Sequence, residues 1–261
     1  KPTPRVNRVY SVQAAGDSGF TASLSLHYLG SEVIGAPLPD SMLILAMRFA
    51  VRESVAGGWN MVSVPVLPDD YRKIKLYPAA VSNAFRFNSV TSTYGARDTL
   101  ATGEGYWVKF GEDTVSAIVG AVHLAETVKV SPGWNIVGTL TEPVPAEAAV
   151  FLPASLNHGP FYGFGKGYTA ADVLMPMKAY WVNVSDSGSM VLSVPGSLLV
   201  PNAALSAAGR TRPEGYGTIT ISDAAGGIQE LRFGRGKPAA PNQYRMPPPG
   251  PGGLFDARFA T

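Results

Sequence analysis

The chain has 261 residues, of which 46% are hydrophobic and only 15% are charged, and its net charge is +2. A chain of this length can bury a core, and its low charge argues against disorder by self-repulsion. The basic residues are scattered, which argues against a nucleic-acid partner, and no apolar run approaches the roughly 18 residues of a membrane-spanning helix. The absence of cysteine excludes disulfides, thiolate metal sites and cysteine nucleophiles.

Glycine and proline punctuate the whole chain, with 29 and 22 occurrences. Both interrupt helices and central strands, and short apolar alternations lie between them. We therefore predict an all-β, antiparallel fold with two tandem β modules flanked by β-sandwich-like strands. Residues 1–52 form the N-terminal flank, in which residues 20–28 alternate as a half-buried strand and residues 41–50 supply a more apolar partner.

The middle of the chain contains an internal repeat. The motif Gly-Trp-Asn at residues 58–60 recurs at 133–135, an offset of 75, and Tyr-Trp-Val at 106–108 recurs at 180–182, an offset of 74. All four tryptophans fall in these motifs, and Tyr94 matches Tyr168 between them. We interpret residues 53–125 and 126–200 as two copies of one β module.

Each copy predicts the same series of strands. In the first copy these are residues 59–66, 84–88, 92–94, 105–110 and 114–119, and the second repeats the order from 134–140 through 180–184 to 189–194. Residues 146–151 favour a single helical turn. A unit this short gains stability by burying a face on its copy, so we expect sheet pairing between the two modules.

Residues 201–261 form a C-terminal region that begins with a linker. A β-hairpin follows, in which residues 216–222 and 228–233 flank a Gly-containing loop. The Pro/Gly-rich stretch 246–253 predicts an extended, solvated arm of the polyproline II type. Residues 254–259 resume a strand-like alternation.

At these residues the sequence resembles a known family. The paired Gly-Trp-Asn and Tyr-Trp-Val segments are similar to the tandem repeat of large extracellular cargo proteins of the bacterial type IX (Por) secretion system. Residues 218–223, 231–234, 246–249 and 255–259 are similar to the segment that often follows those repeats, and residues 19–28 resemble the strand pair that often precedes them. The resemblance covers most of the chain and implies an extracellular or cell-surface location. It carries over no catalytic residue.

No constellation of residues predicts catalysis, a cofactor or a metal site. His27, His123 and His158 lack metal-ligand spacing. The Gly-Phe-Gly-Lys-Gly stretch at 163–167 lacks phosphate-loop spacing and favours a hairpin loop. The loop acids form no calcium-binding ladder, although bound calcium stays open. We predict that the protein is not an enzyme; the alternative is a hydrolase whose carboxylates are brought together by the fold.

The aromatic residues are the most informative set. Tryptophans at equivalent repeat positions, beside Val and Ile, are more often packing residues than ligand platforms. In Tyr-Trp-Val, neighbouring side chains face opposite sides of a strand, so only one of Tyr and Trp can fill a given core. The aromatics in the middle of each repeat are the better candidates for binding glycan rings. They are Phe87, Tyr94, Tyr162, Phe164 and Tyr168.

The first functional hypothesis is an extracellular structural protein, a subunit of a surface filament, coat or matrix in which a terminal strand completes a neighbour's sheet edge. The candidate assembly strands carry Arg5, Val6, Val9, Tyr10 and Val12 at one end and Leu254, Phe255 and Phe259 at the other. The alternative is a carbohydrate-binding or adhesive module of a larger exported protein. The expected partners are further copies, neighbouring domains of the same exported protein, or a polysaccharide.

Overall fold

The computed structural model describes residues 5–6, 33–34, 48–194, 216–234 and 245–259. The chain divides into two compact units, residues 1–47 and 48–261. In the first unit, β1 (Arg5–Val6) pairs antiparallel with β2 (Val33–Ile34). The predicted assembly residues Val9, Tyr10 and Val12 lie outside the described residues, as do the predicted strand at 20–28 and most of its partner at 41–50.

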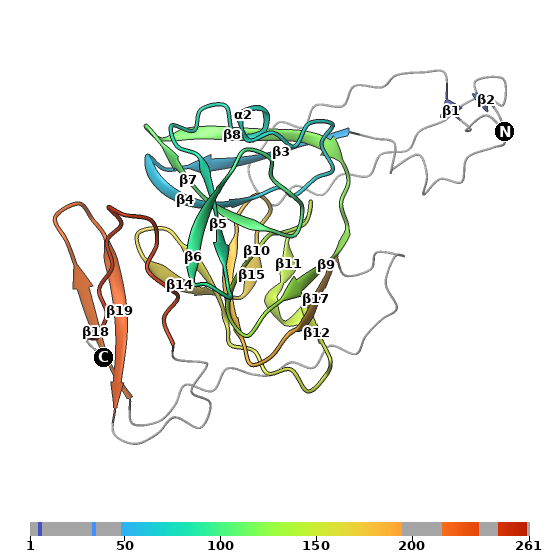
Figure 1. The fold of residues 1–261 in the computed structure, drawn as a ribbon. Coiled ribbons are helices and arrows are strands. Elements are labelled where there is room, and N and C mark those ends of the chain that lie inside the picture. Colours follow the sequence, from blue (N-terminus) through green and yellow to red (C-terminus); the bar gives the residue numbers. More distant parts are fainter. Residues whose placement is uncertain (1–4, 7–32, 35–47, 195–215, 235–244, 260–261) are drawn as a thin grey trace. The chain divides into compact units, whose positions relative to one another are not determined.

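The second unit contains two similar antiparallel β modules, which confirms the all-β prediction (Figure 1). Module 1 comprises β3 (Arg48–Val55), β4 (Gly58–Ser63), β5 (Ala84–Asn88), β6 (Thr93–Arg97), β7 (Gly105–Phe110) and β8 (Thr114–Ala121). Module 2 comprises β9 (Ala125–Val130), β10 (Gly133–Val137), β13 (Phe161–Phe164), β14 (Tyr168–Ala171), β16 (Tyr180–Val184) and β17 (Gly188–Ser193).

A few short elements fill the connections. Module 1 contains α2 (Lys73–Leu76), and module 2 contains β11 (Val144–Pro145), β12 (Val150–Leu152) and β15 (Val173–Leu174). The helical turn expected at residues 146–151 is a 3₁₀ turn, Ala146–Ala148, which ends early because the chain extends again into β12.

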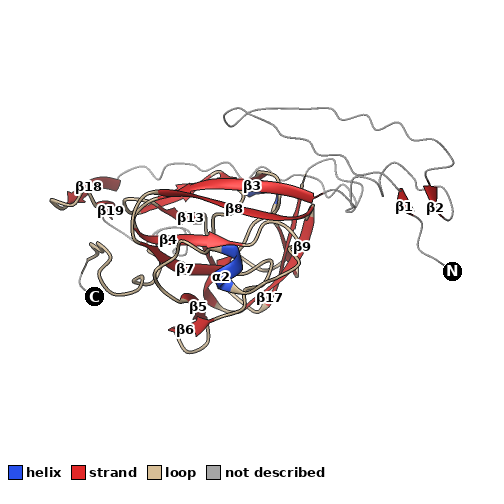
Figure 2. Ribbon diagram, turned by 90° about the horizontal axis from the view of Figure 1, so that it is seen from above, coloured by secondary structure: helices blue, strands red, loops and turns tan. Residues whose placement is uncertain are grey.

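The two modules have the same sheet order. The larger sheets run β4-β7-β5-β6 and β10-β16-β13-β14, while β3 pairs with β8 and β9 pairs with β17, which also pairs with β12. The β3–β8 pair forms a layer beside the sheet that contains β4 and β7 (Figure 2). β3 pairs with β8 along its whole length, from Arg48↔Ala121 to Val55↔Thr114. Module 1 as folded therefore begins before the predicted boundary at residue 53.

The Gly-Trp-Asn motif forms the turn between the first two strands of each module, which lie in different sheets. Gly58 and Gly133 have positive φ angles of 98° and 90°, a conformation that glycine adopts without steric cost. The Asn60 side-chain amide donates to the carbonyls of Ala56 and Gly58, at 2.8 and 3.1 Å. Asn135 makes the equivalent bonds in module 2. The repeated motif is therefore a turn-forming device.

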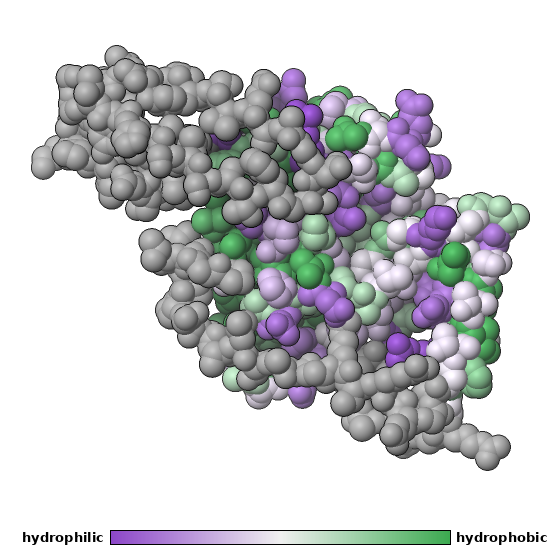
Figure 3. All heavy atoms as spheres, turned by 180° about the vertical axis from the view of Figure 1, so that it is seen from behind, coloured by the Kyte–Doolittle hydropathy of each residue, from purple (hydrophilic) through white to green (hydrophobic). Residues whose placement is uncertain are grey.

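After module 2, β18 (Tyr216–Ser222) and β19 (Ile228–Gly234) form the predicted hairpin. The Asp223 carboxylate accepts a hydrogen bond from the Gly227 amide at 2.7 Å and so closes the loop. Hydrophobic and polar residues alternate on its surface (Figure 3, right-hand side). The hairpin contacts module 2 through its second strand, where the Ile228 amide donates to the Lys166 carbonyl at 2.8 Å.

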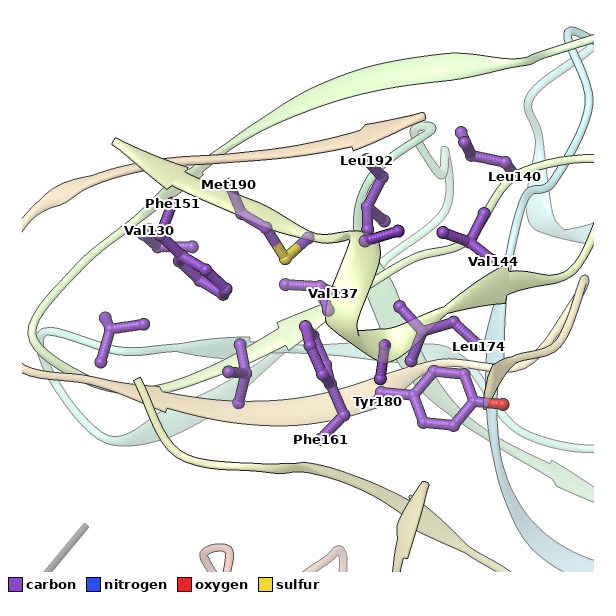
Figure 4. Packing of buried hydrophobic residues seen from close by; sticks show 14 of the residues in the cluster. Val130, Val137, Leu140, Val144, Phe151, Phe161, Leu174, Tyr180, Met190 and Leu192 are labelled. Atoms are coloured by element: carbon purple, nitrogen blue, oxygen red, sulfur yellow. The ribbon is translucent and has the colours of Figure 1, made fainter. Parts of the chain in front are cut away.

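Each module encloses its own hydrophobic core. In module 2 the side chains come from both sheets and from the connecting segments, with Val137, Leu174 and Met190 fully buried among them (Figure 4). The core of module 1 is built in the same way around Val64, Tyr77 and Phe110. A third cluster of buried residues contains side chains of both modules.

Candidate functional site

The Tyr-Trp-Val motif supplies side chains to two different cores. Tyr106 and Val108 face the core of module 1, whereas Trp107 lies in the third cluster and is fully buried. Tyr180 and Trp181 repeat this arrangement in module 2. This confirms the expected alternation, and the opposite face of each strand is buried as well because the other module covers it.

The two modules meet through reciprocal backbone contacts. The Ser63 amide donates to the Met177 carbonyl at 2.8 Å, and the Gly138 amide donates to the Gly103 carbonyl at 2.8 Å. Ser63 and Gly138 are 75 residues apart, and Gly103 and Met177 are 74 apart, so the second contact is the first with the modules exchanged. These contacts are related by a pseudo-two-fold axis. The expected sheet pairing between the modules is limited to isolated β-bridges, because each of the larger sheets lies within one module.

At Gly105 the two modules pack closely against each other. A Cβ atom at this position would lie 2.2 Å from Cγ2 of Ile136 and 2.6 Å from Cβ of Ala179. Ala179 is the repeat equivalent of Gly105, so one copy of the position carries the methyl group and the other leaves room for it.

Aromatic side chains from both modules gather at this pseudo-two-fold axis, and their contacts follow the same symmetry. Phe87 packs edge-on against Trp181 with ring centroids 4.8 Å apart, and Phe164 packs against Trp107 at 4.9 Å. We name this set the aromatic cluster. Its aromatic members are Trp59, Phe85, Phe87, Tyr94, Trp107, Trp134, Tyr162, Phe164, Tyr168 and Trp181.

The structure brings all five predicted glycan-binding aromatics together in the aromatic cluster. Phe87 and Tyr168 are buried, and Tyr94, Tyr162 and Phe164 are half-buried. Tyr94 packs on Phe87 at 5.3 Å, and Tyr168 packs on Phe164 at 5.2 Å. Glycan binding by these residues stays a prediction. A segment from the C-terminal region covers them, so a glycan would have to displace it.

The covering segment is the Pro/Gly-rich stretch near the C-terminal end, residues 245–259, which we name the arm. The hydroxyl groups of Tyr94 and Tyr168 donate to the carbonyls of Pro249 and Pro248, at 2.8 and 3.0 Å. The indole N–H of Trp59 donates to the Gly252 carbonyl at 3.2 Å.

Two expectations about the arm are therefore wrong. It is not solvated, because Pro247 is buried and Met246 and Leu254 pack on the aromatic cluster. Residues 254–259 are not a strand within the described part of the chain, because Leu254 is held by the cluster and Phe255 lies against Gly227 at the start of β19. Of the candidate assembly residues at this end, Phe259 is exposed.

The tyrosine hydroxyls and indole N–H groups of the aromatic cluster are hydrogen-bond donors. Burial raises the pKa of Tyr94 and of Tyr168, so both hydroxyls keep their protons. The indole N–H groups of Trp107 and Trp181 are buried and have no partner of full hydrogen-bond geometry among the described residues. The Trp107 indole nevertheless lowers the pKa of Tyr94, and the Trp181 indole lowers that of Tyr168, so each offsets part of the increase that burial causes.

The other candidate groups fall into ordinary structural contacts. His123 Nε2 lies 3.3 Å from a Glu126 carboxylate oxygen, and this contact lowers the pKa of Glu126. His158 stacks on Phe151 with ring centroids 4.1 Å apart. His27 lies outside the described residues.

Within the described ranges, no group of three or more His, Asp or Glu side chains is placed to hold a metal ion. Among the same residues no helix is long and apolar enough to cross a membrane. The 163–167 stretch ends β13 and forms the hairpin loop, residues 165–167, that leads into β14, which agrees with the predicted hairpin loop. Comparisons of the chain with protein-family models, with curated proteins and with solved structures find no match.

Proposed function

We propose that this chain is an extracellular structural protein, a subunit of a surface filament, coat or matrix that assembles through β-strand contacts, and that it is not an enzyme. The observation that carries the proposal is the outer edge of β18, which pairs with no other strand among the described residues. The resemblance of the paired repeats to exported cargo proteins supports an extracellular or cell-surface location.

The direction of the β18 backbone groups follows from the hairpin. The Asp223 amide donates to the Gly227 carbonyl across the hairpin, whereas the Ile228 amide points away from β18 to Lys166. Antiparallel pairs alternate between hydrogen-bonded and non-hydrogen-bonded positions. Thr218 and Thr220 are therefore non-hydrogen-bonded positions, and their backbone N–H and C=O groups point to the outer edge of β18.

This edge lacks the usual protection against strand addition. Exposed edge strands are commonly blocked by lysine or proline, but β18 has the sequence Tyr-Gly-Thr-Ile-Thr-Ile-Ser. Within the described residues it pairs only with β19. Ile219 and Ile221 are 42% and 37% exposed and share a face with Phe233, which is 49% exposed. A neighbouring strand added here would gain backbone hydrogen bonds and would place its own side chains beside the exposed isoleucines of β18.

The two predicted donor strands differ in availability. Leu254 and Phe255 pack within their own chain, against the aromatic cluster and β19. In the part of the chain that the structure describes, Arg5 and Val6 pair with the two-residue strand β2. The N-terminal segment of a neighbouring copy is therefore the better donor for the β18 edge.

A Thr220→Lys variant tests the proposal. Lysine at this position adds charge to the outer edge, and Glu230 lies directly across the hairpin, so the hairpin itself gains an attractive pair. A Thr91→Lys variant, in the exposed loop between β5 and β6, is the control with the same added charge.

Assembly is measured by light scattering of the purified chain and by negative-stain electron microscopy of cell-derived material. We expect filaments or sheets from the native protein and from Thr91→Lys, and their loss in Thr220→Lys. Monodisperse native monomers, or assembly unchanged by Thr220→Lys, would contradict the proposal. The alternative function, a carbohydrate-binding or adhesive module, predicts glycan binding that Tyr162→Ala combined with Tyr168→Ala removes.

A further inference from the structure

We propose that the aromatic cluster is a recognition surface for an extended Pro/Gly-rich peptide, and that the arm is its exchangeable intramolecular ligand. This binding site is separate from the β18 edge, and it stands whether or not the chain assembles into filaments.

The hydrogen bonds between the cluster and the arm have the character of peptide recognition. In all three bonds a side-chain donor of the cluster meets a backbone carbonyl of the arm: Tyr168 at Pro248, Tyr94 at Pro249 and Trp59 at Gly252. An extended Pro-rich segment makes no backbone hydrogen bonds within itself, so its carbonyls can accept from side chains, as that of Pro247 does from Arg258 at 3.2 Å. Aromatic surfaces that bind such segments use the same combination of flat rings and side-chain donors.

The fit also selects for small residues and for defined anchors. A Cβ atom on Gly250 would lie 3.2 Å from Cζ2 of Trp107, a tight contact with the cluster, and 2.1 Å from Cδ1 of the arm's own Leu254, which would have to move. Pro247 is buried, and Met246 and Leu254 pack on the cluster at the two ends of the contact. A peptide lacking the glycine or either anchor would lose contacts that the native sequence makes.

The recognition surface is built without the arm. Trp107 and Trp181 lie on β7 and β16, which pair along their full lengths with β4 and β10. Phe87 and Phe164 are held by ring contacts across the two modules. We therefore expect the cluster to keep its structure when the arm dissociates. Removal of a segment that was part of the core would instead disorder the residues packed against it.

The experiment uses a single fluorescent label on the arm. The chain has no cysteine, so Gly252→Cys introduces a unique thiol, and a Cβ atom at this position meets no atom within 4 Å. A bimane dye attached there lies beside Trp59, whose indole quenches it on contact. Trp59→Phe, which removes the adjacent quencher, identifies the quenching as contact with the cluster.

A protease site placed within residues 235–244 of the full chain then converts the arm into a separate ligand. Before cleavage we expect quenching that does not depend on protein concentration. After cleavage we expect quenching at high concentration that is lost on dilution, which gives a dissociation constant. Removing one neutral hydrogen bond weakens binding by about fivefold, so Tyr94→Phe and Tyr168→Phe should each raise this constant by about that factor. Tyr71→Phe, in the module 1 core, should leave it unchanged.

Three results would overturn the proposal. Emission that is unquenched in the intact protein would show that the arm does not rest on the cluster. Quenching that survives every dilution after cleavage, in the native chain and in both tyrosine variants, would make the arm a permanent part of the core. Loss of amide-exchange protection in β7 and β16 when the arm dissociates would show that the surface does not persist without it.

Discussion

Asn135 and Asn60 occupy equivalent turns but differ in burial, so they provide a matched pair of perturbations. Asn135 is only 7% exposed, and its amide donates to the carbonyls of Ser131 and Gly133 at 2.8 and 3.1 Å. Its carbonyl oxygen accepts from the Ser131 amide and the Ser89 hydroxyl, both at 3.0 Å. Asn60 makes the three corresponding intramodule bonds at a site that is more exposed to water.

The expected magnitudes follow from these contacts. A hydrogen bond contributes about 1 kcal/mol net, and a buried group that loses its partner costs about 1–3 kcal/mol. Asn135→Ala leaves several half-buried backbone groups unpaired, and we expect it to lower the free energy of unfolding by about 2–3 kcal/mol. In Asn60→Ala water can replace the lost hydrogen-bond partners, so we expect the free energy of unfolding to fall by only about 1 kcal/mol.

Urea unfolding followed by tryptophan fluorescence measures both changes. The two modules share the aromatic cluster, so we expect a single transition, and a shift of its midpoint without a change in slope reports stability alone. Equal losses of the free energy of unfolding in the two variants, or a larger loss for Asn60→Ala, would refute the claim that burial of the Gly-Trp-Asn turn sets the size of the destabilisation.

Two further predictions concern the contact between modules and the dependence on pH. Gly105→Ala should destabilise the protein by about 1–3 kcal/mol, because the added methyl group overpacks the contact between modules. In the same unfolding experiment Gly165→Ala should be nearly neutral, because its added methyl group meets no atom within 4 Å. Equal destabilisation by the two variants would contradict the module contact assigned to Gly105. The His123 contact lowers the pKa of Glu126 below its ordinary value of 4.5, so it contributes stability above that pH that is lost as the pH falls through the lowered pKa. Glu126→Gln should therefore be less stable than the native protein at pH 6 and approach it at pH 3, and a stability difference that is the same at both values would argue against this linkage.

The parts of the fold that the sequence predicts well are those decided by local alternation. The strands Gly105–Phe110 and Tyr180–Val184 have the predicted bounds, because aromatic and β-branched residues run between a glycine or alanine and a polar turn. β9 was not predicted, because Glu126 and Lys129 give it the appearance of a linker and its partner β17 lies about 60 residues later in the chain. Strands whose pairing is distant leave little local signal.

The site shows the same limit more clearly. The sequence groups the aromatics in the middle of each repeat as one set of candidates, but nothing local shows that they form one cluster across two modules. The arm was predicted to be extended and solvated from its composition alone. The contacts that hold it join Gly252 to Trp59 and Pro249 to Tyr94, across 193 and 155 residues of sequence. A solvated polyproline segment and a bound one have the same sequence pattern, and only the surface that receives it distinguishes them.

The position of the arm on the pseudo-two-fold axis has a consequence for stoichiometry. Tyr94 and Tyr168 are repeat equivalents, yet they bond neighbouring carbonyls of one arm, so a single arm occupies the site that both modules create. Two separate modules that each carried an arm would bring two ligands to one site. The tandem chain supplies one arm for two modules. A bound polypeptide has a direction, whereas a two-fold symmetric site accepts either direction equally. The β18–β19 hairpin, which precedes the arm in the chain, is held on module 2 because the Tyr168 amide donates to the Gln229 side-chain oxygen at 3.1 Å, and this favours one direction of the arm.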